Sequence, residues 1–270
     1  MPNTCQVISL NNATDRRSHI EHTFKAAKVD YEFFDAITPD TLVDMGKLLG
    51  LNNLLSNKRL SMGEKSCFLS HIAIWQKMID DELPYVIVFE DDVLLGENAA
   101  DIFMDKTWLS IICDNIDVLK FETFYEKVHL NHAALFLSKS LPKENPPRHL
   151  YRLKSPQMGA GAYLISSNAA KQLLKKIQET PSHALMAIDH ILFEVFIQEF
   201  NIYQMKPAIA CQLMFQDKEK LPSQLEVHRI SNANNSNKLQ YTLPQKILNI
   251  FKRLKRSIGK RTFYQTIEFK

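Results

Sequence analysis

Short apolar runs alternate with amphipathic segments along the first part of the chain. Residues 5–10 and 31–34 are apolar runs of strand length, and residues 16–28 between them have a helical pattern that Thr14 or Asp15 can cap. Strands that are connected through helices usually pair in parallel within one sheet. The pattern therefore predicts an α/β fold with a mostly parallel central sheet flanked by helices.

The most distinct helix start is the sequence Ser-Met-Gly-Glu at positions 61–64. The hydroxyl of Ser61 can accept a hydrogen bond from a free amide of the first turn while Glu64 reaches back to the backbone, which is the pattern of a capping box. Apolar residues then recur on one face, so the helix is expected to continue to about Asp81. Residues 85–89, Tyr-Val-Ile-Val-Phe, give the strongest strand prediction in the chain.

Later segments extend the same alternation and then depart from it. We predict two further strands and two further helices, which are a strand over 117–121, a strand over 163–165, a helix from Ser166 or Ser167 to Ile177, and an amphipathic helix over 188–200. Residues 142–147 are expected to form a surface loop, and the Asn-rich residues 231–237 a linker. The chain is therefore expected to have a main domain over residues 1–226 and an appendage over 227–270.

Composition supports a folded protein and argues against several classes. Of the 270 residues, 45% are hydrophobic and 23% are charged, so the chain can bury a core and general disorder is excluded. No run of 18 apolar residues and no basic-then-apolar start is present, so we expect neither a membrane span nor a secretion signal. The four cysteines are far apart, which makes a disulfide framework or structural zinc unexpected and favours a reducing cytosol.

The net charge of +3 conceals a division between an acidic body and a basic tail. Residues 227–270 contain ten basic residues and one acidic residue, whereas residues 1–226 contain 23 basic and 29 acidic residues. Apolar residues between 247 and 258 form one helical stripe, with basic residues mainly on the other side. This pattern predicts a helix that binds an anionic membrane surface. A helix packed on the main domain is the alternative, and no nucleic-acid partner is expected because aromatic residues do not interleave the basic run.

Three carboxylates, Glu90, Asp91 and Asp92, directly follow the strongest predicted strand. Their mutual repulsion and desolvation oppose folding unless a cation, hydrogen bonds or water offset them. Ligands bind at the carboxyl ends of strands in open α/β sheets, and carboxylate oxygens suit Mg²⁺ or Mn²⁺, which can hold a diphosphate. In an extended chain Glu90 and Asp92 point one way and Asp91 the other. The alternative is a solvated acidic turn.

These segments together resemble glycosyltransferase family 25, the bacterial lipooligosaccharide galactosyltransferases that are related to collagen galactosyltransferases. The similarity covers about residues 5–215 and rests on the order and spacing of short pieces, which are 8–10 with 16–17, 33–36, 61–64 with 67–71, 88–93, 159–166 and 188–189. The sequence departs from the family at Ser9, where Asn is more common.

The resemblance implies a GT-A-like fold and an inverting transfer of galactose from UDP-galactose with the help of Mn²⁺ or Mg²⁺. Asp92 is then the expected metal ligand, and Asp91 is expected to support the metal or contact the donor ribose. Asp189 is the expected catalytic base, with helix capping as the alternative role. The implied acceptor is a sugar of lipid-linked lipooligosaccharide or lipopolysaccharide, with a β-1,4 linkage to glucose or N-acetylglucosamine.

The resemblance also suggests a set of donor-binding residues, which are Ser9, Leu10, Arg16, Asp35, Ala36, Ser70, His71, Glu90, Asp91, Gly159 and Gly161. For several of them a structural role competes: His71 as a hydrogen-bonded core residue, Arg16 as an exposed helix arginine, and the two glycines as the entry to a strand. Cys67 is expected in the core. Gln212 and His228 are candidates for closing the site.

The sequence thus favours a metal-assisted galactosyltransferase that is cytoplasmic and peripheral on the inner face of the bacterial inner membrane. One competing hypothesis is a metal-dependent phosphohydrolase, for which Asp189 and Glu122 are a small supply of further acids. The other is a non-catalytic membrane-surface adaptor, which leaves the three carboxylates unexplained.

Overall fold

A computed structural model describes residues 3–133, 147–216 and 264–270 of the chain. A nine-stranded sheet runs through the centre, and a three-stranded sheet lies beside it. The large sheet has the order β12 (Tyr264–Thr266), β7 (Lys127–Ala133), β8 (His149–Leu153), β10 (Ile202–Lys206), β5 (Val118–Lys120), β9 (Ala162–Ser166), β3 (Tyr85–Glu90), β1 (Cys5–Ser9) and β2 (Glu32–Asp35). The small sheet has the order β4 (Val93–Leu95), β11 (Ala210–Gln212) and β6 (Glu122–Thr123).

The prediction of a mostly parallel sheet is wrong, because the large sheet is mixed. Three of its pairings are parallel and five are antiparallel. The helix-connected strands near the N-terminus pair in parallel as expected, but β9 inserts antiparallel between β3 and β5. Five strands, β2, β1, β3, β5 and β10, nevertheless run in one direction. Their carboxyl ends therefore meet at one edge of the sheet.

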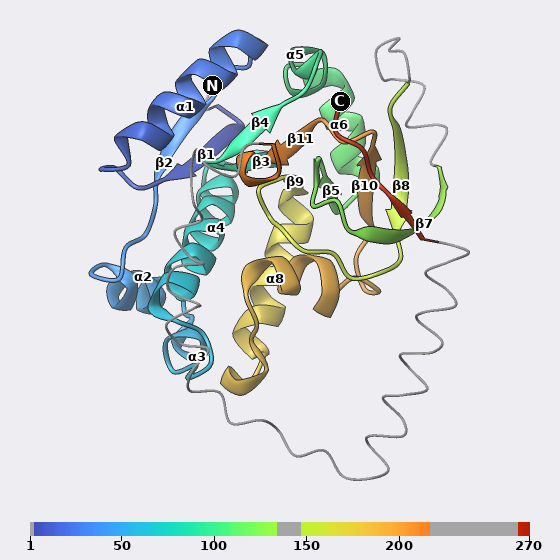
Figure 1. Ribbon diagram of the computed structural model, residues 1–270. Helices are drawn as coiled ribbons and strands as arrows, with labels where there is room; N and C mark the ends of the chain where they lie inside the picture. Colours follow the sequence, from blue (N-terminus) through green and yellow to red (C-terminus); the bar gives the residue numbers. More distant parts are fainter. Residues whose placement is uncertain (1–2, 134–146, 217–263) are drawn as a thin grey trace.

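Helices cover both faces of this sheet (Figure 1). One face packs against α2 (Leu42–Leu48), α3 (Asn52–Leu55), α4 (Met62–Asp80) and α8 (Ser167–Glu179). The other packs against α1 (Thr14–Ala27), α5 (Ala99–Phe103) and α6 (Lys106–Asn115). Alternate residues of β3 enter the two cores, Val86 and Val88 on one side and Ile87 and Phe89 on the other. Residues 85–89 are therefore buried on both faces of the sheet, and Glu90 ends the strand half-buried.

The predicted capping residues are correct for α4 and α8 and wrong for α1. The capping box of α4 is confirmed, since the Ser61 hydroxyl accepts from the Glu64 amide and the Glu64 carboxylate accepts from the Ser61 amide. Ser166 caps α8 as predicted. Capping of α1 by Thr14 or Asp15 is wrong: Ala13 occupies the cap position, and within the described residues its side chain makes no capping hydrogen bond.

The predicted helix over 188–200 is correct only in its first turns. α9 (Ile188–His190) passes directly into a π-helical turn, Ile191–Val195, and the chain then forms turns before β10. Three consecutive residues, Ile191, Leu192 and Phe193, are fully buried. All three belong to the hydrophobic core on the side of the sheet that α4 and α8 cover. Two short 3-10 turns, Ser182–Ala184 and Leu213–Phe215, complete the helical elements described.

The last seven residues return to the main sheet rather than extending a tail. β12 pairs antiparallel with β7, and Ile267 is 1% exposed. The Thr123 hydroxyl donates to the Ile267 carbonyl at 2.7 Å, and Arg148 donates to the Lys270 carbonyl at 2.5 Å. The predicted linker over 231–237 and the amphipathic stripe over 247–258 lie outside the described residues, as does nearly all of the loop predicted over 142–147. Among the described helices, none has both the length and the apolar character needed to cross a bilayer.

Candidate active site

The three carboxylates lie where β3 ends and the chain turns into β4. Asp91 is bound on both oxygens, because the Ser9 hydroxyl donates to one at 2.7 Å and the Arg16 guanidinium donates to the other at 2.5 Å. The Arg16 guanidinium also lies 3.5 Å from Asp92. The side chains of Arg16 and Asp91 are only 10% and 12% exposed. This buried ion pair joins α1 and β1 to the end of β3, so Arg16 is not the exposed helix arginine of the alternative interpretation.

Two cavities of about 290 and 270 Å³ meet at these carboxylates. Cys67, Glu90 and Asp92 line both cavities and thus form their common wall. The smaller cavity also contains most of the predicted donor-binding residues, which are Ser9, Leu10, Arg16, Ala36, Ser70 and Asp91. The larger cavity contains Gly159, Asp189 and Gln212. The carboxylates therefore face spaces large enough for a small ligand, and a solvated acidic turn does not describe them.

Negative charge is concentrated around this common wall. Burial and the charge of Glu122 raise the pKa of Glu90 to about 8. Burial and the charge of Glu90 raise the pKa of Asp92 to about 7. Burial alone lowers the pKa of Arg16, but the charges of Asp91 and Asp92 outweigh it and raise that pKa above its usual value. One oxygen of Asp92, Oδ1, is buried and has no hydrogen-bond partner among the described residues.

A fully buried ion pair, Lys120 with Glu122, lies beneath the backbone of residues 158–161. The Lys120 ammonium donates to the Glu122 carboxylate at 2.8 Å, to the Met158 carbonyl at 2.9 Å and to the Gly159 carbonyl. Glu122 also accepts from the Gly161 amide at 2.7 Å. Lys120 and Glu122 are both 0% exposed, so solvent does not screen the attraction between them. Their hydrogen bonds to the backbone fix the loop over residues 158–161 above the pair.

The two glycines of this loop are needed because Glu122 lies directly against them. Gly159 has φ +83°, in the left-handed region, and a Cβ there would lie 2.8 Å from a Glu122 carboxylate oxygen. A Cβ on Gly161 would lie 2.8 Å from the other oxygen. Gly159 lines the larger cavity, whereas Gly161 lies outside both cavities that the described residues form. Close packing on Glu122 therefore explains why both positions need glycine. Of the two, Gly159 alone lines a cavity of the described residues in which it could contact a donor.

Asp189, on the first turn of α9, lines the larger cavity together with Glu90 and Asp92. Its carboxylate accepts from the Gly159 amide at 3.3 Å and from the His190 amide at 2.9 Å. The cap position of α9 belongs to Ala187, so the alternative role of Asp189 as the helix cap is wrong. The loop above Lys120 and the helix of Asp189 are thus linked through the Gly159 amide.

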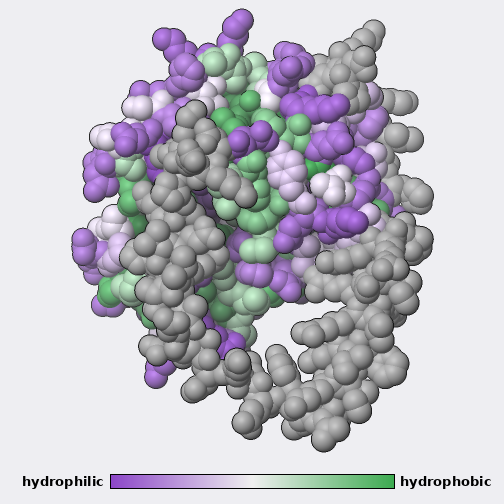
Figure 2. All heavy atoms as spheres, in the orientation of Figure 1, coloured by the Kyte–Doolittle hydropathy of each residue, from purple (hydrophilic) through white to green (hydrophobic). Residues whose placement is uncertain are grey.

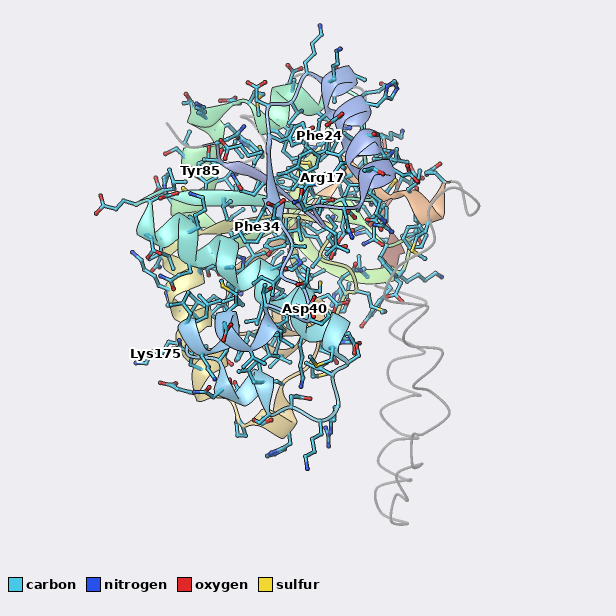
Figure 3. The ribbon with its side chains drawn as sticks, turned by 90° about the vertical axis from the view of Figure 1, so that its left-hand side faces the viewer. Arg17, Phe24, Phe34, Asp40, Tyr85 and Lys175 are labelled. Atoms are coloured by element: carbon cyan, nitrogen blue, oxygen red, sulfur yellow. The ribbon has the colours of Figure 1, made fainter. Side chains whose placement is uncertain are left out.

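His71 and Asp35 lie outside both cavities that the described residues line. His71 is 0% exposed, its Nδ1 lies 2.8 Å from the Tyr163 hydroxyl, and burial lowers its pKa to about 4. It is a hydrogen-bonded core residue, as the competing interpretation held, although its Nε2 approaches Glu90 at 3.6 Å. Asp35 is exposed and pairs with Arg17, whose side chain lies beside the end of β2 (Figure 3).

Sequence reasoning did not find the role of Lys120 and treated Glu122 only as a spare acid. A signal was present, since Lys120 interrupts an apolar strand between Leu119 and Phe121. A lysine that is buried in a strand needs a charged partner, and Glu122 is two residues away on the same face. Gln212, a candidate for closing the site, lines the larger cavity, where its amide lies 3.3 Å from the Glu90 carboxylate. His228 lies outside the described residues.

Comparison with known proteins identifies related sequences. A family model described as glycosyltransferase family 25 (LPS biosynthesis protein) matches residues 3–192. Lipooligosaccharide biosynthesis protein lic2B of Haemophilus influenzae is 39% identical over 230 residues, or 83% of this chain and 82% of the relative. Lacto-N-neotetraose biosynthesis glycosyltransferase LgtE of Neisseria gonorrhoeae is 34% identical over 210 residues, or 76% and 72%. Among solved structures, mouse xyloside xylosyltransferase 1 aligns over 74% of this chain and 71% of that chain with 13% identity and a TM-score of 0.38, which is too low to carry a conclusion.

Replacing Glu122 with Gln should destabilise the protein, because it leaves the Lys120 ammonium buried without its counter-charge. We expect a loss of about 3–5 kcal/mol in the free energy of unfolding, measured by urea denaturation. Glu126→Gln, an exposed position on the same segment, is the matched control and should change stability little. Equal stability of the two variants would show that Glu122 does not stabilise the buried charge of Lys120.

The metal-free protein should lose stability as the pH rises from about 4 to about 8. Glu90 and Asp92 have ordinary pKa values of 4.5 and 3.8 when unfolded and values of about 8 and about 7 when folded. In this window the folded state binds more protons, so each carboxyl contributes a slope of up to about −1.4 kcal/mol per pH unit.

Urea denaturation between pH 5 and 8 in the presence of a chelator measures this slope. Glu90→Gln and Asp92→Asn should each flatten it, whereas Asp101→Asn, on the exposed side of α5, should leave it unchanged. A wild-type slope that neither substitution reduces would contradict the raised pKa values.

Proposed function

The chain belongs to glycosyltransferase family 25, and on this basis we propose that it transfers galactose from UDP-galactose, with inversion, to an acceptor sugar of lipooligosaccharide or lipopolysaccharide. Its relatives include lipooligosaccharide biosynthesis proteins and lacto-N-neotetraose biosynthesis glycosyltransferases, which supports an oligosaccharide acceptor. The proposed linkage is β-1,4 to glucose or N-acetylglucosamine. The observation that carries the proposal is the meeting of two cavities at Glu90 and Asp92, with Asp189 also lining the larger one.

The fold is consistent with a GT-A-like donor site. In open α/β sheets, ligands bind beyond the carboxyl ends of the strands. Here β1 ends at Ser9 and β3 ends at Glu90, and both residues lie at the smaller cavity. We therefore propose that the nucleoside of the donor occupies the smaller cavity, and that the transferred sugar and the acceptor meet in the larger one.

Asp92 fits the role of a ligand for Mn²⁺ or Mg²⁺. Its Oδ1 is buried without a hydrogen-bond partner in the described part of the chain, and its carboxylate is surrounded mainly by other acids. Asp91 fits the role less well, because each of its oxygens already accepts a hydrogen bond from Ser9 or Arg16. We propose that Asp92 is the principal ligand and that Asp91 orients Arg16 beside it. When bound, the cation supplies positive charge for the diphosphate of the donor.

The residues around the site account for the remaining steps of an inverting transfer. Arg16 provides a fixed positive charge at the wall where the diphosphate is proposed to lie, and this charge stabilises the negative charge that develops on the leaving UDP. Asp189 accepts the proton of the acceptor hydroxyl. The oxygen of that hydroxyl forms a bond to the anomeric carbon of the donor sugar, while the bond between that carbon and UDP breaks. The Gly159 amide holds the Asp189 carboxylate toward the larger cavity.

The competing phosphohydrolase would use the same acids, and the larger cavity does gather Glu64, Glu90, Asp92 and Asp189. Family membership favours a glycosyltransferase over that hydrolase, and the cavities favour an enzyme over a non-catalytic adaptor. The basic residues between 238 and 261 remain in the proposal as an attachment to anionic lipid at the cytoplasmic face of the inner membrane, near a lipid-linked acceptor.

Substituting Asp92 or Asp189 should reduce the rate of transfer, and each for a different reason. With a panel of UDP-sugars and acceptor glycosides, UDP release should be highest with UDP-galactose and should require the acceptor. Asp92→Asn should lower kcat/KM by about 10²–10³, because stabilisation of the leaving group is lost. Asp189→Asn should lower kcat by about 10²–10⁴ with little change in the KM for UDP-galactose.

Asp101→Asn is the control for both variants and should retain wild-type rates. Circular dichroism confirms that each variant is folded. Full activity of Asp92→Asn, with and without added Mn²⁺, would remove the metal assignment, and wild-type turnover of Asp189→Asn would remove the base.

Membrane attachment is best tested by charge reversal, because deletion of the tail would also remove the buried Ile267. Changing Lys252, Arg253 and Arg256 together to Glu should reduce sedimentation with vesicles containing phosphatidylglycerol by at least about tenfold, since each basic residue near such a surface contributes about 1 kcal/mol. The control changes three exposed lysines of the body, Lys25, Lys28 and Lys47, to Glu. Equal vesicle binding by the two triple variants would contradict attachment through the tail.

A further inference from the structure

Cys67, His71 and Glu90 form a compact group of potential metal ligands that the proposed transfer reaction does not use. Cys67 and His71 are one turn apart on α4, so their side chains lie on the same face of that helix. Glu90, at the end of β3, faces them. One ligand atom from each residue, the cysteine sulfur, a histidine ring nitrogen and a carboxylate oxygen, can be chosen so that all three lie within 4.8 Å of one another.

A second, independent observation concerns the imidazole of His71. This side chain is 0% exposed, yet its Nε2 has no hydrogen-bond partner within the described residues and is directed at Glu90, 3.6 Å away. Leaving a buried ring nitrogen without a partner costs free energy, so such an atom calls for an explanation. The other nitrogen, Nδ1, lies 2.8 Å from the Tyr163 hydroxyl, which also accepts from the Trp75 indole.

We propose that Cys67, His71 and Glu90 bind a zinc ion through the cysteine sulfur, the histidine Nε2 and a carboxylate oxygen. Sulfur, imidazole and carboxylate together match the preference of zinc, whereas Mg²⁺ and Mn²⁺ prefer oxygen ligands alone. The contact between Nδ1 and Tyr163 is the kind of outer hydrogen bond that orients a metal-bound histidine. The negative charges of Glu122 and Asp189, which also act on His71, favour a divalent cation at this position.

Three protein ligands leave the fourth zinc position for solvent or a small ligand. Cys67 and Glu90 both line the two cavities, so that position opens toward them. The site therefore differs from a structural zinc site with four protein ligands, which the spacing of the cysteines makes unexpected. Its ligand set differs from that of the proposed oxygen-ligand site, because it does not include Asp92, although both sites lie at the wall that the two cavities share. This inference does not rest on the proposed transferase reaction.

Cobalt substitution tests the site directly, because a thiolate bound to Co²⁺ gives a charge-transfer absorption band in the near ultraviolet. Chelator-treated full-length protein should develop this band on addition of Co²⁺ and lose it when Zn²⁺ displaces the cobalt. Cys67→Ser should abolish the band and His71→Gln should weaken Co²⁺ binding at least tenfold. Tyr163→Phe, which removes the outer hydrogen bond, should weaken it about 10–100-fold.

Two controls separate this site from its neighbours. Cys113→Ser, a half-buried cysteine on α6, should retain the band, and so should Asp92→Asn, which removes the proposed oxygen ligand. Absence of the band in wild-type protein, or its loss in Cys113→Ser, would overturn the zinc site. Loss of transfer in Asp92→Asn with the band intact would leave both proposals standing, so the two fail independently.

A measurement on the wild-type chain keeps the proposal testable if a buried-site variant does not fold. The rate of alkylation of Cys67 by iodoacetamide, followed by peptide mass, should fall at least tenfold when Zn²⁺ is added, whereas the rate at Cys113 should not change. Equal alkylation of Cys67 with and without Zn²⁺ would also overturn the site.

Discussion

Crowding of negative charge at the end of strand β3 is the constraint on which the site depends. Residues 85–89 of β3 are buried, so the acids lie at its carboxyl end, with Glu90 as its last residue and Asp91 and Asp92 directly after it. Glu122 and Asp189 add charge from other elements. Arg16 pairs with Asp91 and lies close to Asp92, whereas Lys120 pairs with Glu122. Burial makes this arrangement costly for a metal-free protein, and the raised pKa values of Glu90 and Asp92 express that cost. A bound divalent cation would reduce it.

Positioning of the site comes from long-range contacts that link otherwise separate elements. Arg16 of α1 and Asp91 are 75 residues apart in sequence. Lys120 holds the backbone of Met158 and Gly159, and Gly159 in turn holds Asp189. The buried pair of Lys120 and Glu122 therefore sets the geometry of the larger cavity without lining it. On the face shown in Figure 2, hydrophobic residues lie mainly toward the middle and hydrophilic residues toward the rim.

Local patterns were sufficient for much of the fold and for part of the site. Periodicity and capping chemistry located α4, α8 and β3, and the acids after β3 marked the cavity wall. Strand order depends on contacts between distant segments, so the antiparallel insertion of β9 and the return of residues 264–270 to the sheet were not predictable from local pattern. The ion pair between Arg16 and Asp91 was not predictable for the same reason, because 75 residues separate the two in sequence. Lys120 lies inside the strand predicted over 117–121, and its charge was the signal of a buried partner.

Titration of UDP into the protein by calorimetry, with and without Mn²⁺, tests the central claim most directly. If the acids at the end of β3 hold a cation that carries the donor diphosphate, UDP should bind much more tightly in the presence of Mn²⁺. The repulsion between the diphosphate and the uncompensated carboxylates should make metal-free binding weak. Equal affinity under the two conditions would contradict the account, because the carboxylate cluster would then have no part in holding the donor.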